Sequence, residues 1–232
     1  MRKSFLFVLA FLTGSTLMAH ATQAESMNCD DDDRPPSTHN YSGNPSDVLQ
    51  PRHLELTRPF AGYGRLEVHV CNANLRVRTA RDVKEIRLTV DLNNQLDGHS
   101  TSDYIHTLRI QPDNGVIQLK FQKGVHATVT LTMPMGPDSD NEFNLGRGDL
   151  DFNAIGSAGV RQINVGMGHM QLLVDGDKNY SKMSVNVGMG SLHDHRRGGH
   201  DGHFVVSKDY AGSGAGSLDI NVGMGSLDIR ND

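Results

Sequence analysis

Four of the twelve histidines lie within one short stretch near the C-terminal end of the chain. They are His193, His195, His200 and His203, and an Arg-Arg-Gly-Gly turn separates the first pair from the second. Neutral imidazole binds Zn²⁺, Ni²⁺ and Cu²⁺ well, so this tract predicts a transition-metal site. The competing interpretation is an exposed polar loop whose histidines titrate at about pH 6.5 and bind nothing. The two arginines of the turn would repel a cation and favour that second interpretation.

Motifs for catalysis are missing from the sequence. There is no G-x-S-x-G elbow, no H-E-x-x-H pair, no P-loop and no G-x-G-x-x-G segment that opens a helix. Ser191, His193 and Asp194 lie close along the chain, but a catalytic triad also needs a particular orientation in space. We therefore expect no catalytic residues and no enzyme activity. The formal charge of −5 also argues against a nucleic-acid partner, because proteins that bind nucleic acid are usually strongly basic.

The first 24 residues have the three parts of a secretory signal peptide. Arg2 and Lys3 supply a positive start, an apolar run follows over 5–12, and small residues near 19–24 offer A-x-A-like cleavage sites. No later segment has the roughly 20 apolar residues of a membrane-spanning helix. We expect an exported protein, in the periplasm or outside the cell. Cleavage would change the charge from −5 to −7, because two cations are lost.

The two cysteines, Cys29 and Cys71, would meet an oxidising compartment after export. A disulfide between them would close a loop of about 42 residues and stabilise the fold by about 4 kcal/mol in the chain-entropy model. The alternative is a buried free Cys71 on an apolar strand face, with Cys29 loose in the preceding segment. Two cysteines are too few for a zinc framework of the CxxC…CxxC kind or for a disulfide-rich scaffold.

Residues 25–51 are rich in Asp, Asn, Ser and Pro and poor in apolar side chains. Such a composition buries too little apolar surface to offset the entropy lost when the chain is ordered. We expect a flexible acidic leader here, in which the aspartate run 30–33 is solvated and binds no cation.

From about residue 52 onward, apolar and polar side chains alternate with a period of two. Strict alternation is typical of half-buried strands, and no stretch of comparable length has helical periodicity. The chain is therefore expected to be all-β, with β coils over 52–142 that continue into a Gly-rich part over 143–232. Apolar positions that define the pattern are Leu66, Val68, Val70, Leu75, Val77, Ile86, Leu88, Val90, Ile117, Leu119, Val129 and Leu131.

The Gly-rich part contains four copies of one motif, in which an apolar-Asn-apolar triplet precedes Gly-x-Gly and a second short alternating run. The first glycines of the copies are 20, 22 and 35 residues apart, so the third interval holds an insertion of about 13 residues. A period near 20 residues with constant register indicates stacked β units. Gly-x-Gly permits a backbone bend that a Cβ would forbid. The expected turn glycines are Gly146, Gly148, Gly166, Gly168, Gly188, Gly190, Gly223 and Gly225.

Stacked copies of this motif predict a parallel β-solenoid with coils of about 20 residues. The alternative is an antiparallel β meander or sandwich with three-residue Gly-Met-Gly hairpins. In the solenoid the asparagines would form a ladder about 4.8 Å apart, and Arg147 would share a corner column with three methionines. The asparagines are Asn144, Asn164, Asn186 and Asn221, and two further outward columns would hold Asp149, His169, Ser191 and Ser226, and Asp151, Gln171, His193 and Asp228.

The strand-turn-strand copies resemble the putative-adhesin, or toast-rack, domains of bacterial envelope proteins. The segment from Gly64 to Val90 is similar to the opening coil of that family, and Leu131-Thr-Met-Pro-Met-Gly136 resembles its Pro-containing corner. The resemblance covers about 60–232 and implies a right-handed parallel β-solenoid, mostly of unknown function and without agreed catalytic residues. The chain departs from the family at Ala73-Asn74, where Asn-Gly is frequent, and in its His-rich insertion.

Two classes of function are consistent with these residues. The first is a non-enzymatic, adhesin-like envelope protein without a cofactor, whose repeated polar face contacts a protein or a glycan. The second is a periplasmic metal-binding or metal-sensing protein that uses the loop 193–203. Because the last copy ends close to the C-terminus, its strand edge is expected to be free, and a free edge can pair with another copy to form a homo-oligomer.

Overall fold

The computed structural model describes residues 29, 40–41, 43–80, 82–94, 98–134, 136, 138–155 and 159–232. These residues form fifteen strands and one short 3₁₀-helix, so the expected all-β class is confirmed. The predicted signal peptide and the aspartate run 30–33 lie outside the described residues. Within the described ranges, no helix has the length and apolar character needed to cross a bilayer.

Nine strands and the 3₁₀-helix η1 precede the Gly-rich part of the chain. They are short because turns and bends interrupt the apolar alternation every few residues. The elements are β1 (Asn40–Tyr41), β2 (Val48–Gln50), β3 (His53–Pro59), β4 (Arg65–Cys71), β5 (Ala73–Ala80), β6 (Glu85–Leu92), η1 (Thr101–Tyr104), β7 (Ile105–Ile110), β8 (Asn114–Lys120) and β9 (Ala127–Pro134).

The Gly-rich part supplies six further strands, three of which are unusually long. In these three, a single strand continues through Gly-Met-Gly and includes both apolar runs of one motif copy. The strands are β10 (Asp140–Arg147), β11 (Leu150–Asn153), β12 (Val160–Val174), β13 (Lys182–Asp194), β14 (Gly202–Ala211) and β15 (Ser217–Asn231).

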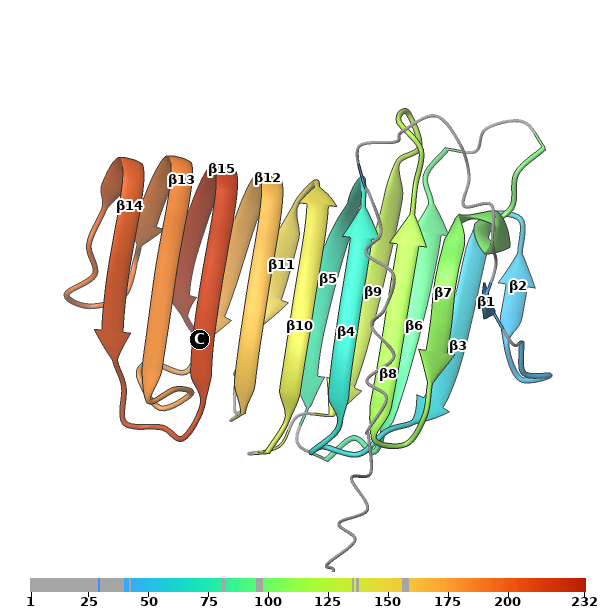
Figure 1. Cartoon of the computed structure of the whole chain (residues 1–232), viewed down its shortest axis with the longest axis horizontal. Coiled ribbons are helices and arrows are strands. Elements are labelled where there is room, and N and C mark those ends of the chain that lie inside the picture. Colours follow the sequence, from blue (N-terminus) through green and yellow to red (C-terminus); the bar gives the residue numbers. More distant parts are fainter. Residues whose placement is uncertain are drawn as a thin grey trace, which may run out of the picture.

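All fifteen strands belong to one sheet that folds over on itself into two layers (Figure 1). The fold occurs within β12, whose first half pairs with β10 and whose second half pairs with β11. The first layer continues from β10 through β4, β8 and β7 to β1, and the second continues from β11 through β5, β9, β6 and β3 to β2. We call the bend between the layers, at Gly-Met-Gly, the corner.

The sheet is mixed, which corrects the expectation of a wholly parallel solenoid. Parallel pairing joins β8, β4, β10, β12, β15 and β13. Most pairs in the flanks are antiparallel, because β7 and β8, and likewise β2 and β3, are joined by turns too short for a parallel crossover, while β1 pairs with β7 in parallel. At the other end β14 returns antiparallel along β13. The antiparallel alternative is therefore correct for the flanks and wrong for the repeated centre.

The copies do not stack in sequence order, which corrects a second expectation. β15, the last copy, lies between β12 and β13 and pairs in parallel with both. The insertion explains this order, because β14 occupies the outer side of β13 and the chain then crosses back over 212–216. The N–H of Ser181 donates to the carbonyl of Gly216 at 2.5 Å where this crossing passes the loop before β13. The C-terminal strand is thus an internal strand, and the free edge at this end is β14.

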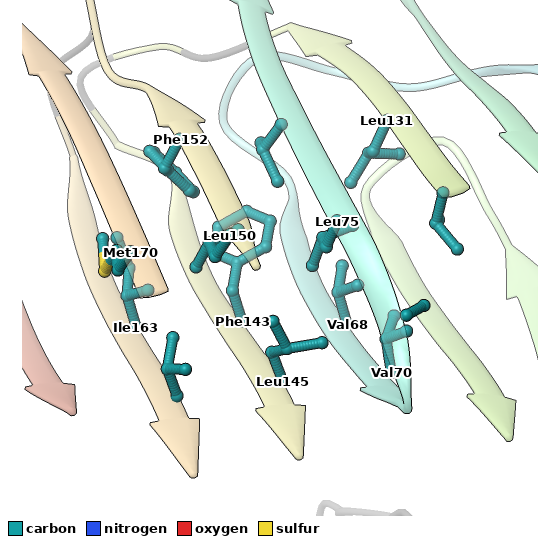
Figure 2. Close-up of a cluster of buried hydrophobic side chains, with 14 of the residues drawn as sticks. Val68, Val70, Leu75, Leu131, Phe143, Leu145, Leu150, Phe152, Ile163 and Met170 are labelled. Atoms are coloured by element: carbon teal, nitrogen blue, oxygen red, sulfur yellow. The ribbon is translucent and has the colours of Figure 1, made fainter. Parts of the chain in front are cut away.

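The core lies between the two layers and contains the apolar positions of the alternating pattern. Figure 2 shows this packing at the middle of the molecule, where Phe143 and Phe152 meet edge to face with ring centroids 4.9 Å apart. Fully buried members include Val68, Val70, Leu75, Leu131, Phe143, Phe152, Ile163, Met170, Val185, Ile220 and Leu227.

The glycine corners are required by backbone-to-backbone contact. Gly168 has φ +148°, and a Cβ added to it would lie 1.8 Å from the carbonyl oxygen of Gly148 in the neighbouring bend between β10 and β11. Gly225 makes the same approach to Gly168, and Gly190 makes it to Gly225. At the position of the second glycine of each copy, glycine is therefore the only residue type that permits adjacent corners to stack.

Part of the segment expected to be a flexible leader is paired in the sheet. β1 pairs with β7, and β2 pairs with β3. Between them Asp47 accepts a hydrogen bond from Tyr41 Oη at 2.5 Å and forms an ion pair with Arg58 at 2.6 Å. The hydrogen bonds from Arg58 hold the pKa of Asp47 down at about 2. These strand pairings could not be predicted from the composition of the segment, because only a few residues take part in them.

Cys29 and Cys71 form a disulfide, with Cα atoms 5.5 Å apart. Cys71 ends β4 at the corner, and the bond ties the segment around Cys29 to it across 42 residues of sequence. Gly146 lies against the disulfide, and a Cβ added to this glycine would be 2.7 Å from the Sγ of Cys29. The disulfide therefore lies where the N-terminal part of the sheet meets the first Gly-rich copy.

Candidate functional site

The four histidines of the C-terminal tract take different positions. His193 is the penultimate residue of β13, and its Nδ1 lies 3.9 Å from Asp201 Oδ1. Its ring centroid is 6.4 Å from that of His195 and 5.9 Å from that of His203, while His200 is exposed in the loop. In the described part of the chain, no three His, Cys, Asp or Glu side chains converge as a metal ion would need. Metal binding by the four histidines stays a prediction.

One imidazole of this tract and one from another strand approach the same carboxylate. Asp228 on β15 lies between His169 on β12, with Nε2 to Oδ2 at 3.5 Å, and His195, with Nε2 to Oδ1 at 3.6 Å. The His169 Nδ1 is 2.7 Å from Ser226 Oγ, which fixes the ring. Arg230 lies 3.8 Å from the same carboxylate. The sequence placed His169 and Asp228 in neighbouring outward columns, with His193 in the column of Asp228, but it did not predict the approach of His195.

Arg196 of the tract points into the molecule instead of toward solvent. Its guanidinium forms an ion pair with the buried carboxylate of Asp194 at 2.7 Å and donates to Tyr180 Oη at 2.6 Å. The guanidinium carbon also lies 4.7 Å from the centre of the Tyr210 ring. We call these four residues the end cap, because they cover the core beside β13 and β14.

The end cap excludes the sequence-adjacent serine, histidine and aspartate from acting as a triad. Burial alone would raise the pKa of the Asp194 carboxyl, but hydrogen bonds and charge from Arg196 outweigh it and hold that pKa below its usual value. Asp194 faces inward and accepts hydrogen bonds from Arg196, whereas His193 faces outward toward Asp201. Alternation could have shown this, since Asp194 shares the inward face of β13 with Leu192 and needs a buried cation.

The predicted asparagine ladder is present on the first layer, in the order 144, 164, 221, 186. Every carboxamide donates in the same direction, at 2.7 Å from Asn164 to Asn144, 3.0 Å from Asn221 to Asn164 and 3.1 Å from Asn186 to Asn221. Ser207 on β14 extends the ladder by donating to Asn186 at 2.9 Å. Aligned hydrogen bonds of this kind polarise and strengthen one another.

His69 accepts at the far end of the ladder. Its Nδ1 lies 3.2 Å from the Asn144 amide nitrogen, which also donates to Glu142 at 2.7 Å. Burial lowers the pKa of His69, and this outweighs the opposing charges of Glu142 and Glu67. The ring is therefore neutral at pH 7, which leaves Nδ1 free to accept.

The second layer carries the other predicted columns on its outer face. Asp151, Gln171, Asp228 and His193 are aligned in that order, and Arg78 forms an ion pair with Asp151 at 2.5 Å. His169, Ser226 and Ser191 are also aligned, whereas Asp149 precedes β11 and its N–H donates to Asn74 Oδ1. The alignment of side chains between copies was thus predictable from the sequence, but the order of the strands in the sheet was not.

A pocket of about 470 Å³ opens at the corner, on the N-terminal side of the methionine column. Three exposed cationic or imidazole side chains stand at its wall, Lys123, His126 and Arg147, and none of the described residues that line it is acidic. Its loops are shaped by amides, since Asn94 both accepts from the His126 N–H and donates to the Gly124 carbonyl, each at 2.6 Å. The lining residues are Asn72, Ala73, Asn74, Asn93, Asn94, Lys123, Gly124, Val125, His126, Ala127, Arg147 and Gly148.

Sequence reasoning missed this corner pocket. Its residues come from four turns that lie far apart in the chain, between β4 and β5, after β6, between β8 and β9, and between β10 and β11. None of the four turns has a recognisable binding motif by itself. Only the stacking of the strands brings them together.

No protein-family model and no curated protein matches the sequence. Among solved structures, the chain is similar to a putative cell adhesion protein from Clostridium sporogenes. The two share 11% identity with a TM-score of 0.42, over 80% of this chain and 100% of the other. A likeness this distant assigns neither a family nor a function to the chain.

Proposed function

We propose that this chain is an exported, non-enzymatic, adhesin-like protein of the cell envelope that binds an acidic glycan at the corner pocket. That the parallel centre of the sheet is a right-handed solenoid of the toast-rack type is part of the same proposal, supported by the parallel pairing of β4, β10, β12, β15 and β13. Export to the periplasm or the cell exterior is supported by the residues of the signal peptide and by the disulfide.

The charge of the corner pocket carries the glycan proposal. Lys123 and Arg147 concentrate positive charge in a concave site on a chain whose formal charge is −5. A guanidinium can bind a carboxylate or sulfate through two parallel hydrogen bonds, and amide side chains are suited to sugar hydroxyls. A glycan with negatively charged groups matches both, whereas a neutral sugar would leave the two cations without a partner.

Calorimetric titration with two oligosaccharide probes tests this function. Oligogalacturonate should bind, and a neutral cello-oligosaccharide of equal length should bind at least tenfold more weakly. Arg147→Gln should weaken oligogalacturonate binding about tenfold, which corresponds to about 1.4 kcal/mol. Arg109→Gln, at an exposed arginine on β7 outside the pocket, is the matched control and should change nothing. Equal binding of both probes, or an unaffected Arg147→Gln variant, would contradict the proposal, as would cleavage of the oligosaccharide.

Metal binding is a second candidate function, favoured by the position of Asp228 between His169 and His195, although these three side chains would have to draw closer together to coordinate an ion. Its test is thermal unfolding with EDTA and then with Zn²⁺, Ni²⁺ or Cu²⁺, because a ligand at 100 times its Kd stabilises by about 2.7 kcal/mol. If this cluster binds the ion, His169→Ala abolishes the shift and His200→Ala preserves it. Loss in His200→Ala alone would instead indicate the loop. Point variants are needed because deletion of 193–203 would also remove the end cap.

A further inference from the structure

Exposed apolar side chains gather along one edge of the corner. Among the described residues, nine large apolar side chains are exposed, and five of them lie here. The three methionines stack across β12, β15 and β13 in register, and Val205 on β14 lies opposite the bulge in β13 that contains the last methionine. We call this set the corner ridge: Met167, Met224, Met189, Val205 and Phe204.

Phe204 stands out within the corner ridge. Its side chain is 78% exposed, and its backbone has φ +76°, a left-handed conformation that a phenylalanine rarely adopts. Val205 follows it with 75% exposure. Strained backbone conformations cluster at functional sites, so an exposed aromatic side chain on a strained residue points to a role in contact.

The edge strands at the two ends of the sheet differ in length. At the N-terminal end the last strands are β1 and β2, with two and three residues, and such short strands offer little for another chain to pair with. At the C-terminal end the last strand is β14, which has ten residues and, among the described strands, pairs with β13 alone. A long edge strand next to an apolar ridge is suited to strand addition.

We infer that β14 pairs antiparallel with β14 of a second copy, so that Phe204 and Val205 of both copies become covered. β14 follows β13 around the corner, since Val206 pairs with Val187 before the bend and Phe204 with Gly190 after it. Two bent strands can pair along their full length only if their bends coincide. The two-fold axis must therefore pass close to Val206.

Charge selects the register of this pairing. With Val206 opposite Val206, Phe204 faces Lys208 and His203 faces Asp209, so a cation meets an aromatic ring and an imidazole meets a carboxylate. Moving the centre to Val205 loses both contacts, because Phe204 then faces Val206 and His203 faces Ser207, and moving it to Lys208 places two lysines opposite each other. The pair is closed, because each copy uses its one long edge, and no filament follows.

Sedimentation equilibrium of the purified protein over a wide concentration range tests the inference. The protein should form a dimer and no larger species, and Val205→Lys should weaken association at least tenfold by placing a charge on the edge. Leu49→Lys, at an exposed position on β2 at the opposite end, is the matched control and should leave the dimer intact. A monomer at all concentrations, or an unchanged dimer in Val205→Lys, would overturn the inference. Weaker association in Leu49→Lys would show head-to-tail pairing instead.

Phe204→Gly separates a role in contact from a role in folding. Glycine accepts the positive φ without strain, so the variant should unfold at a higher temperature than the parent when both are dilute and monomeric. The same variant should dimerise more weakly, because it loses the aromatic ring. If it associates as tightly as the parent, the ring is not at the interface and the inference fails. Neither outcome depends on glycan binding at the corner pocket.

Discussion

The N-terminal strands over 52–142 and the Gly-rich copies over 143–232 bury similar apolar faces by different means. The N-terminal strands differ in sequence, and several of them pair antiparallel. The Gly-rich copies place the same residue type at the same position on each strand, and their corners stack backbone on backbone. The first arrangement tolerates change in many small steps, whereas the second depends on a few positions where nothing but glycine fits.

The largest expected effect is at the glycine corner. Gly168→Ala would place its Cβ 1.8 Å from the Gly148 carbonyl oxygen, so we expect a loss on the order of 5 kcal/mol or failure to fold. Gly176→Ala is the control, since Gly176 also has positive φ but no heavy atom within 4 Å of the added Cβ, and should cost about 1 kcal/mol. Urea unfolding measures both. Equal effects would mean that φ, and not stacking, requires glycine at the corner.

The disulfide comes next, because it fastens the junction between the two regions. Reduction opens a loop of 42 residues, and the chain-entropy model gives a loss of about 4 kcal/mol. Unfolding in urea with and without dithiothreitol measures it, with the Cys29→Ser/Cys71→Ser variant as a control that should not respond to the reductant. An unchanged midpoint after reduction would show that strand stacking alone holds the junction.

Arg196 tests whether the Gly-rich region needs its end cap. Arg196→Met leaves the Asp194 carboxylate buried without its cation, and breaking a buried ion pair costs about 3 kcal/mol. Arg197→Met, at the exposed neighbouring arginine, should stay within about 0.5 kcal/mol of the parent. Comparable losses in the two variants would assign the effect to loop charge and remove the end cap from the comparison.

The smallest effect concerns His69, where the N-terminal region meets the asparagine ladder. Its pKa is lowered in the folded protein, so the unfolded chain binds the proton more readily, and the contribution of His69 to stability is lost as pH falls below about 6.5. The thermal midpoint of the parent should therefore fall more between pH 7.5 and 5.5 than that of His69→Gln. Parallel pH profiles for the two proteins would contradict a neutral, accepting His69.

The histidine tract shows how much of the candidate sites could be predicted from the sequence. Spacing alone grouped His193, His195, His200 and His203, but the structure turns Arg196 of the same tract into the core and brings His169 to Asp228 from another strand. The corner pocket had no local signal at all. Contacts between side chains on neighbouring strands were predictable where the repeat fixed their register, and not where loops decided their approach.

The local pattern was sufficient to predict most strands from residue 52 onward, their buried face, the side chains that align from copy to copy, and the positions that require glycine. Those properties follow from a period of two and from repeated motifs, which are local. Three features could not be read from that pattern and are visible in the folded chain: the last copy lies between the second and third, β14 is the free edge, and Asp194 and Arg196 close the core. Nearly identical copies form equivalent interfaces in any order, so the ladders align equally well and the connecting loops select the order.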